Sequence, residues 1–156
     1  MNVPRTLKKE KIQELKLRTP LTIESGTPLR EVICKMQESR RGSVLVQKNG
    51  LLVGLFTERD AMTKGALSFD KLGSAPIDQF MSPQPKTIKL NHSIADAIAI
   101  MAKGGYRRLP IVDDKGAICG LVSARDMIAY LAEHFPYEVL NLPPDPRLIA
   151  TEKEGA

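Results

Sequence analysis

The sequence predicts an α+β protein, α/β-like in its element order, made of two β-α-β-β-α units packed sheet to sheet about a pseudo-two-fold axis. Three observations support this prediction. The chain of 156 residues contains one internal duplication. Both copies show the same order of strand and helix signals, and a unit of about 60 residues buries little apolar surface on its own. Two such units that share a core are therefore expected.

The duplication emerges when the sequence is compared with itself. At a displacement of 65 residues, which becomes 66 after one inserted residue, identical residues recur in the same order. The identical pairs are Ile12/Ile77, Pro20/Pro85, Thr22/Thr87, Ile23/Ile88, Ile33/Ile98 and Met36/Met101, then Arg41/Arg107, Val46/Val112, Gly50/Gly116, Gly54/Gly120, Leu55/Leu121, Arg59/Arg125 and Asp60/Asp126. Two copies are too few for a solenoid, so we expect a pair of similar units.

The first segment, residues 1–20, is expected to be an N-terminal helix. Over residues 5–17, the apolar side chains of Leu7, Ile12 and Leu15 lie on one side of a helix. Residues 1–20 also carry six basic and two acidic side chains. Most of the net charge of +5 therefore belongs to this segment rather than to the repeats.

Each repeat begins with a short strand, expected at residues 21–23 and 87–90, and continues with an amphipathic helix. In the first copy, Thr27 is the expected N-cap, with Pro28 at the first helical position. In the second copy, Ser93 and the residue three positions later form a capping box. The apolar residues of these helices recur at helical spacing, as Leu29, Val32, Ile33 and Met36 and as Ile94, Ala97, Ile98 and Met101.

A β-hairpin and a second helix complete each repeat. Asn49-Gly50 in the first copy and the stretch that ends in Gly116 in the second are turn sequences, because glycine adopts positive φ freely. The second helices begin at Thr57 and Ser123. The strands of the hairpins are expected at residues 44–46 and 51–56, and at residues 109–112 and 117–122.

These elements divide the chain into five parts. The parts are the N-terminal helix (1–20), the first repeat (21–66), a linker with glycine and proline (67–79), the second repeat (80–132) and a C-terminal arm (133–156). Prolines exclude a regular helix from the arm, yet it contains several apolar residues. An arm that docks on its own module or on a partner subunit and a flexible terminus are both compatible with this pattern.

The composition excludes several classes of protein. The chain has no Trp, three Tyr and four Phe, so few rings are available to stack on nucleic-acid bases. No apolar run approaches the roughly 18 residues that span a bilayer. Two cysteines are not a disulfide framework and favour a cytoplasmic location. The sequence shows no metal-ligand spacing and no catalytic arrangement, so we expect neither a metal site nor an enzyme.

One motif occurs in both repeats, as Gly54-Leu-Phe-Thr-Glu-Arg-Asp60 and Gly120-Leu-Val-Ser-Ala-Arg-Asp126. The hydroxyl residue and the Asp three positions later are the two partners of a capping box, which is a structural role. The same helix start also attracts phosphate, and an Asp beside it can accept hydrogen bonds from ribose hydroxyls. The two interpretations are compatible, and the motif leaves both open.

The duplicated pattern resembles a pair of cystathionine-β-synthase (CBS) domains, a Bateman module, over residues 10–132. Both copies of the motif resemble that family's ribose–phosphate motif, and Tyr106-Arg107-Arg108-Leu109-Pro110-Ile111-Val112-Asp113 resembles its stretch around the middle strand. The resemblance implies two related clefts that bind adenosine ligands such as AMP, ADP or ATP. In some members the ligand is NAD(H) or S-adenosylmethionine.

The resemblance also implies ligand-binding residues. They are Asp126 and Asp60 for ribose hydroxyls, Ser123 and Thr57 for phosphate, Thr87 and Thr22 beside the base or phosphate, Tyr106 and Pro110 beside the adenine, and Arg107, Arg108 and Arg125 for phosphate charge. A partly buried Tyr106 and a solvated turn at Arg107-Arg108 are the structural alternatives. The first copy, aligned as Arg40-Arg41-Gly42-Ser43-Val44, lacks the ring and the proline. We therefore expect the second copy to form the better site.

The leading hypothesis is a regulatory module that binds an adenine nucleotide (AMP, ADP or ATP) and passes the bound state to an unidentified effector protein. The resemblance implies a homodimer, and no catalytic cofactor is expected. Two alternatives stay open. One is a dimeric interaction scaffold whose clefts bind no ligand, and the other is a nucleic-acid-binding protein that uses the basic N-terminus. Membrane association is not expected.

Overall fold

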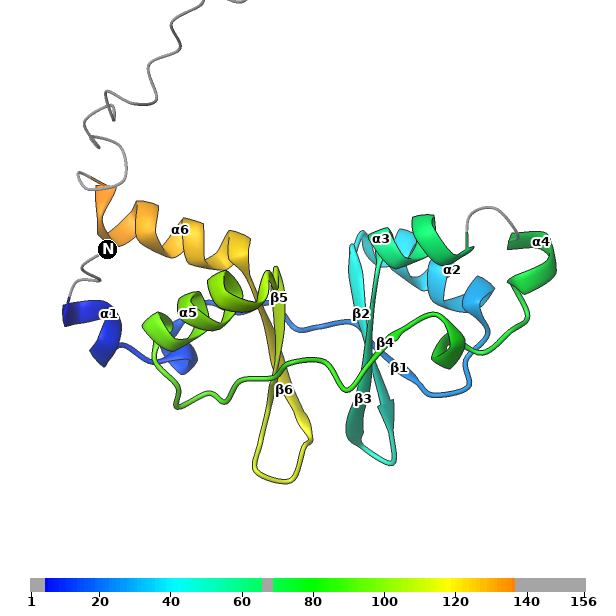
Figure 1. Cartoon of the computed structure of the whole chain (residues 1–156), viewed down its shortest axis with the longest axis horizontal. Helices are drawn as coiled ribbons and strands as arrows, with labels where there is room; N and C mark the ends of the chain where they lie inside the picture. The colour runs from blue at the N-terminus through cyan, green and yellow to red at the C-terminus, as the bar shows by residue number, and fades with distance from the viewer. Residues whose placement is uncertain (1–4, 66–68, 137–156) are drawn as a thin grey trace, which may run out of the picture.

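The structure, a computed structural model, describes residues 5–65 and 69–136. It contains two α+β units side by side, with the strands of both units facing the middle of the molecule and the helices outside (Figure 1). The elements are, in chain order, α1 (Arg5–Lys9), η1 (Ile12–Glu14), β1 (Thr22–Glu24), α2 (Leu29–Ser39), β2 (Ser43–Lys48), β3 (Leu51–Thr57), α3 (Glu58–Asp60), the π-helical turn η2 (Ala61–Gly65), α4 (Phe69–Leu72), η4 (Ile77–Gln79), β4 (Ser82–Pro83), α5 (Ile94–Gly104), β5 (Arg108–Val112), β6 (Ile118–Ser123) and α6 (Ala124–His134). Within this part of the chain, no helix is long and apolar enough to cross a membrane.

A proline interrupts the first strand of the second unit. In the first unit the strand order is β1-β2-β3-β4, with β1 parallel to β2, and the Leu45 N–H donates to the Leu21 carbonyl. The equivalent of Leu45 in β5 is Pro110, which has no N–H to donate. The strand expected at residues 87–90 is therefore reduced to a single bridge between Ile88 and Ile111, beside the β5–β6 hairpin.

The inserted residue lies in the second hairpin and not before Arg41, which corrects the alignment of the two copies. Ser43 pairs with Thr57, and Arg108 pairs with Ser123 at the equivalent place, so the displacement is 65 residues between β2 and β5 but 66 between β3 and β6. The helices α2 and α5 also end alike, at the left-handed residues Arg40 (φ 51°) and Gly105 (φ 68°). Arg41 is therefore equivalent to Tyr106, and not to Arg107 as the identical side chains suggest.

The leading segment of each repeat crosses to the other unit. Leu7 and Ile12 lie in the core of the second unit with residues of α5, β5 and α6. The Ile12 N–H donates to the His92 carbonyl (2.9 Å), and the Ile94 N–H donates to the Glu10 carbonyl (3.0 Å). The helix expected over residues 5–17 is wrong beyond residue 9, because the chain there uses its backbone groups to pair with the second unit.

The residues expected to form a linker make the matching contact with the first unit. Ile77, the equivalent of Ile12, is buried in the first core. Its N–H donates to the Thr27 carbonyl (2.8 Å), and the Leu29 N–H donates to the Ala75 carbonyl (2.9 Å). These bonds repeat those of the N-terminal segment at a displacement of 65 residues. The exchange of leading segments gives the pseudo-two-fold relationship between the units.

Helix starts agree with the sequence at three of the four predicted caps. Capping boxes occur at Ser93, Thr57 and Ser123, each with an Asp three residues later. The exception is α2, where Pro28 is the N-cap and the Thr27 hydroxyl donates to the carbonyl of residue 24. Carbonyls of the crossing segment accept the first N–H groups of α2, so no side-chain cap is needed there. Most of the predicted C-terminal arm lies outside the described residues.

Candidate functional site

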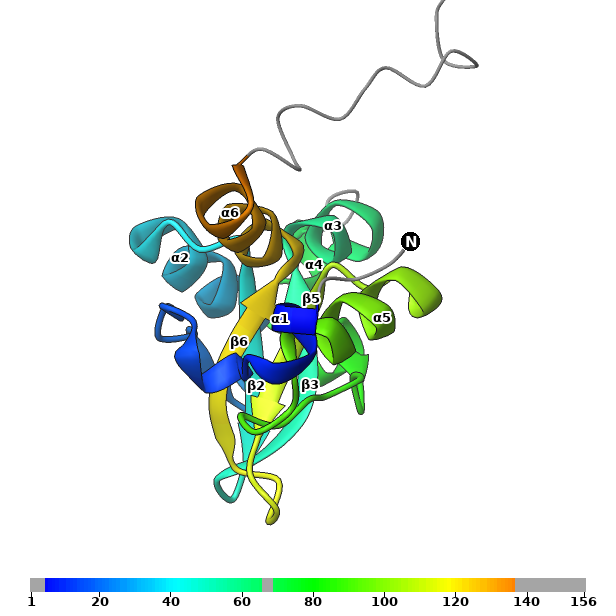
Figure 2. The ribbon, with the colours of Figure 1, turned by 90° about the vertical axis from the view of Figure 1, so that its left-hand side faces the viewer.

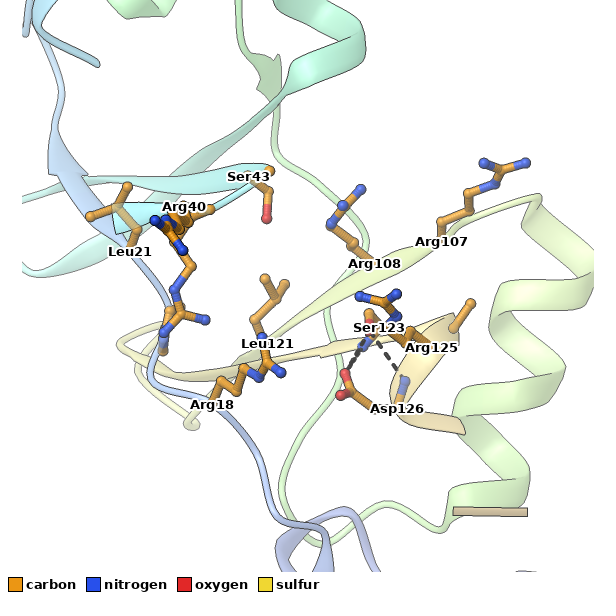
Figure 3. Close-up of a pocket in the computed structure, with 14 residues that line it drawn as sticks. Arg18, Leu21, Arg40, Ser43, Arg107, Arg108, Leu121, Ser123, Arg125 and Asp126 are labelled. Atoms are coloured by element: carbon orange, nitrogen blue, oxygen red, sulfur yellow. Dashed lines mark hydrogen bonds between the residues drawn. The ribbon is translucent and has the colours of Figure 1, made fainter. Parts of the chain in front are cut away.

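A cleft with a volume of about 440 Å³ lies between the two units, at the start of α6 (Figure 3). This volume is in the range of pockets that bind nucleotide-sized molecules. The lining residues are Arg18, Pro20 and Leu21 before β1, Arg40 to Ser43 between α2 and β2, Arg107 and Arg108 at β5, and Leu121, Ser123, Ala124, Arg125 and Asp126 at β6 and α6. The first repeat therefore contributes half of the lining residues, three before β1 and four from the connection between α2 and β2.

The floor of the cleft contains the capping box of α6. The Ser123 N–H and the Ser123 hydroxyl both donate to Oδ2 of Asp126, at 2.7 and 2.6 Å, and the Asp126 N–H donates to Ser123 Oγ (3.3 Å). The other carboxylate oxygen, Oδ1, has no hydrogen bond from any described residue. The residue is thus held in place by one oxygen while the second can accept hydrogen bonds from a ligand. The capping and ligand-binding roles are compatible in this geometry.

Positive charge dominates the walls of the cleft. The lining residues include one carboxylate, that of Asp126, and six arginines, Arg18, Arg40, Arg41, Arg107, Arg108 and Arg125. The guanidinium group of Arg107 points away from Asp126 (Figure 3). None of these arginines takes part in an ion pair within the described residues. The free N–H groups at the start of α6 add a partial positive charge. The cleft is therefore suited to an anion, and arginine favours phosphate because its planar group donates two hydrogen bonds at once.

The remaining lining residues are small or apolar. Leu121 extends into the cleft from the second unit (Figure 3), whereas the Leu21 side chain, which also lines it, packs against the first core. The buried Ser43 lies beside them and makes no side-chain hydrogen bond with a described residue, so its hydroxyl is available. An apolar wall with a few polar groups is the usual environment of a nucleobase or another flat ring.

In the equivalent motif of the first repeat, side chains of that repeat bind both carboxylate oxygens of Asp60. Thr57 donates through its N–H and its hydroxyl to Oδ2 of Asp60, both at 2.9 Å. Unlike in the second repeat, Lys64 forms an ion pair with Oδ1 of this Asp at 3.2 Å. The carboxylate of Glu58 lies against Gly42, where the second repeat has the methyl group of Ala124. These contacts favour the second repeat for ligand binding, for a physical reason that differs from the one inferred from the sequence.

The structure brings together part of the predicted site. Five predicted residues line the cleft: Arg107, Arg108, Ser123, Arg125 and Asp126. The other six, Thr22, Thr57, Asp60, Thr87, Tyr106 and Pro110, do not line it. Pro110 is buried within β5, and the Tyr106 ring lies over Gly104. Thr87 precedes Ile88, which bridges Ile111 of β5, so it lies next to the second hairpin but does not line the cleft.

Sequence reasoning missed the contribution of the first repeat, namely Arg18, Arg40, Arg41 and Ser43. No short sequence pattern indicates that the leading segment packs against the other unit, because this packing is a tertiary feature. The basic pair Arg40-Arg41 was visible, but the misplaced insertion aligned it with Tyr106-Arg107. Within residues 5–65 and 69–136, no three His, Cys, Asp or Glu side chains are grouped to hold a metal ion.

Comparisons with known proteins agree with this architecture. An uncharacterized 17.7 kDa protein of Acidianus ambivalens is 28% identical over 79% of this chain and 74% of its own length. The inosine-5'-monophosphate dehydrogenase of Thermoplasma acidophilum is 32% identical over 81% of this chain but 26% of the enzyme, so the chain spans about a quarter of that relative. A solved structure of a CBS domain protein from Pyrobaculum aerophilum, complexed with AMP, has a TM-score of 0.67 at 21% identity, and the match covers 79% of this chain and 98% of that one.

The family comparison covers most of the chain. The CBS domain matches twice, at residues 12–66 and 77–133. Both matches begin at the crossing segments, with Ile12 in one copy and Ile77 in the other. The protein therefore belongs to the CBS-domain family and carries two tandem CBS domains.

Proposed function

We propose that the cleft at Ser123 and Asp126 binds an adenosine-containing nucleotide as a regulatory ligand. The observation that carries this proposal is the free Oδ1 of Asp126 next to a helix start and to unpaired arginines. A nucleotide needs both kinds of group, because ribose hydroxyls donate hydrogen bonds to a carboxylate and phosphate oxygens accept them. No other described part of the chain combines them.

The lining residues support a specific orientation. Oδ1 of Asp126 accepts hydrogen bonds from the ribose hydroxyls. The start of α6 and the guanidinium groups of Arg108 and Arg125 bind the phosphate. The adenine ring packs against the apolar side chain of Leu121 and excludes water from it. AMP in the related structure from Pyrobaculum aerophilum supports the ligand class.

The proposed module is not an enzyme, acts in the cytoplasm and transmits its bound state to an effector protein. Binding changes the effector's response only if the ligand prefers one arrangement of the two units over another. The cleft supports such coupling because both units contribute arginines to it. A ligand held by both walls therefore stabilises one relative position of the units.

We also expect the module to form a homodimer. Met62 and Ile128, which are equivalent residues of the two repeats, are 73% and 64% exposed. They belong to η2 and α6, and Figures 1 and 2 show α3, which η2 continues, and α6 along the same edge of the molecule. Two exposed apolar residues related by the pseudo-two-fold axis are a suitable surface for a symmetric interface.

The test is calorimetric titration with adenosine, AMP, ADP, ATP, NAD and S-adenosylmethionine. Asp126→Ala should weaken binding at least tenfold, while Asp60→Ala, the matched change in the other repeat, leaves it within about twofold. Both variants lose one capping contact, which costs about 1 kcal/mol of folding free energy. Equal losses of affinity would contradict the assignment to the second repeat, and no binding of any adenosine compound would favour a scaffold without ligand.

A further inference from the structure

The charge of the cleft exceeds what a single phosphate group requires. Its lining includes six arginines and one aspartate. AMP carries one phosphate group with about two negative charges at neutral pH, which leaves most of the guanidinium groups without a counter-charge. Unpaired like charges that share one cleft repel each other, and a longer chain of phosphates relieves that repulsion.

Arg40 adds an independent observation. Its backbone is left-handed (φ 51°), and its equivalent at the end of α5 is Gly105 (φ 68°). Glycine is the usual residue there because a side chain with a Cβ is strained in this conformation. The Arg40 side chain is exposed and makes no hydrogen bond or ion pair with a described residue. No polar contact within the described residues therefore accounts for an arginine at a position that its backbone disfavours.

We propose that the cleft selects a nucleotide with three phosphates, and that Arg40 is the residue that distinguishes it from a monophosphate. This inference rests on the proposed function, because it concerns the same cleft. Arg108 and Arg125 hold the first phosphate at the start of α6. Arg18 and Arg40, on the opposite wall (Figure 3), bind the outer phosphates.

In this arrangement, the length of the phosphate chain determines which walls of the cleft the ligand contacts. A triphosphate contacts both walls of the cleft, whereas a monophosphate contacts the wall at α6. The number of phosphates therefore decides whether the two units are linked through the ligand. The left-handed backbone of Arg40 is therefore strained in the free protein, and its side chain makes its contact only when the ligand is bound.

The experiment compares Kd values for AMP, ATP and inorganic triphosphate in the wild type, Arg40→Gly and Arg40→Asn. ATP should bind the wild type at least tenfold more tightly than AMP. Arg40→Gly should weaken ATP binding about tenfold, the effect of one charge-assisted contact, and leave AMP within about twofold. The same variant should melt about 2–4 °C higher, because glycine relieves the strain. Arg40→Asn, whose side chain tolerates this conformation, should show the same loss of ATP affinity.

The matched control is Asn49→Gly, a change at another left-handed position (φ 52°) outside the cleft. It should leave the affinities for AMP and ATP unchanged. Equal affinities of the wild type for AMP and ATP, or unchanged ATP affinity in both Arg40 variants, would overturn the inference and leave the proposed function standing. Inorganic triphosphate that binds as tightly as ATP would contradict the adenosine assignment and support the polyphosphate preference.

Discussion

Replacement of Ile12 by alanine tests whether the N-terminal segment is part of the second unit. Ile12 is fully buried among residues of α5, β5 and α6, although it lies far from them in sequence. Removal of a buried isoleucine side chain beyond Cβ typically costs about 2–5 kcal/mol, through lost burial and the cavity left behind. The free energy of unfolding of a native protein is about 5–15 kcal/mol in total. Ile12→Ala should therefore lower the urea midpoint substantially.

Three further variants make the measurement specific. Ile12→Val should cost about 1 kcal/mol, because it removes one methylene group. Ile77→Ala, the equivalent change in the first core, should cost as much as Ile12→Ala. The neighbouring Gln13 is exposed, and Gln13→Ala should change the free energy of unfolding by less than about 0.5 kcal/mol. A cost below about 1 kcal/mol for Ile12→Ala would refute the crossed arrangement.

Two other predictions concern acid stability and assembly. Hydrogen bonds from Ser93 hold the pKa of Asp96 below its ordinary value, so the stability it contributes is present above the unfolded-state pKa of about 4 and is lost as pH falls through the lower folded-state pKa. The urea midpoint of Asp96→Asn should therefore change less between pH 5 and pH 3 than that of the wild type, and an identical pH dependence would contradict this assignment. The double variant Met62→Lys/Ile128→Lys should be monomeric by light scattering while the exposed control Ala102→Lys stays dimeric, and an unchanged dimer would exclude this surface.

The misplaced insertion shows where sequence comparison fails. Matching Arg41 to Arg107 aligns identical side chains, but the backbone makes Arg41 equivalent to Tyr106. The deciding signal is the left-handed residue that ends each helix, which is Arg40 in one copy and Gly105 in the other. A helix that ends in a glycine is recognisable from sequence, whereas one that ends in a left-handed arginine is not.

The site divides in the same way. The motif residues Ser123 and Asp126 were predictable, because a capping box depends on residues three positions apart. The opposite wall was not, because Arg18 follows the crossing segment and Arg40 ends α2 of the first unit, and both reach the motif only through the packing of the two units. The preference for the second repeat was predicted from Tyr106 and Pro110, neither of which lines the cleft.

By itself, the sequence determined the duplication, the α+β class and the capping boxes, because each depends on identity or on spacing over a few residues. Only the tertiary structure decided that Ile12 and Ile77 exchange cores and that Pro110 shortens the first strand of the second unit. It also decided that Lys64 forms an ion pair with Oδ1 of Asp60, whereas Oδ1 of Asp126 has no partner among the described residues. These features depend on which backbone and side-chain groups, distant in sequence, meet in the folded chain. An alignment that is wrong by one residue assigns the wrong equivalent residues and so predicts the wrong partners.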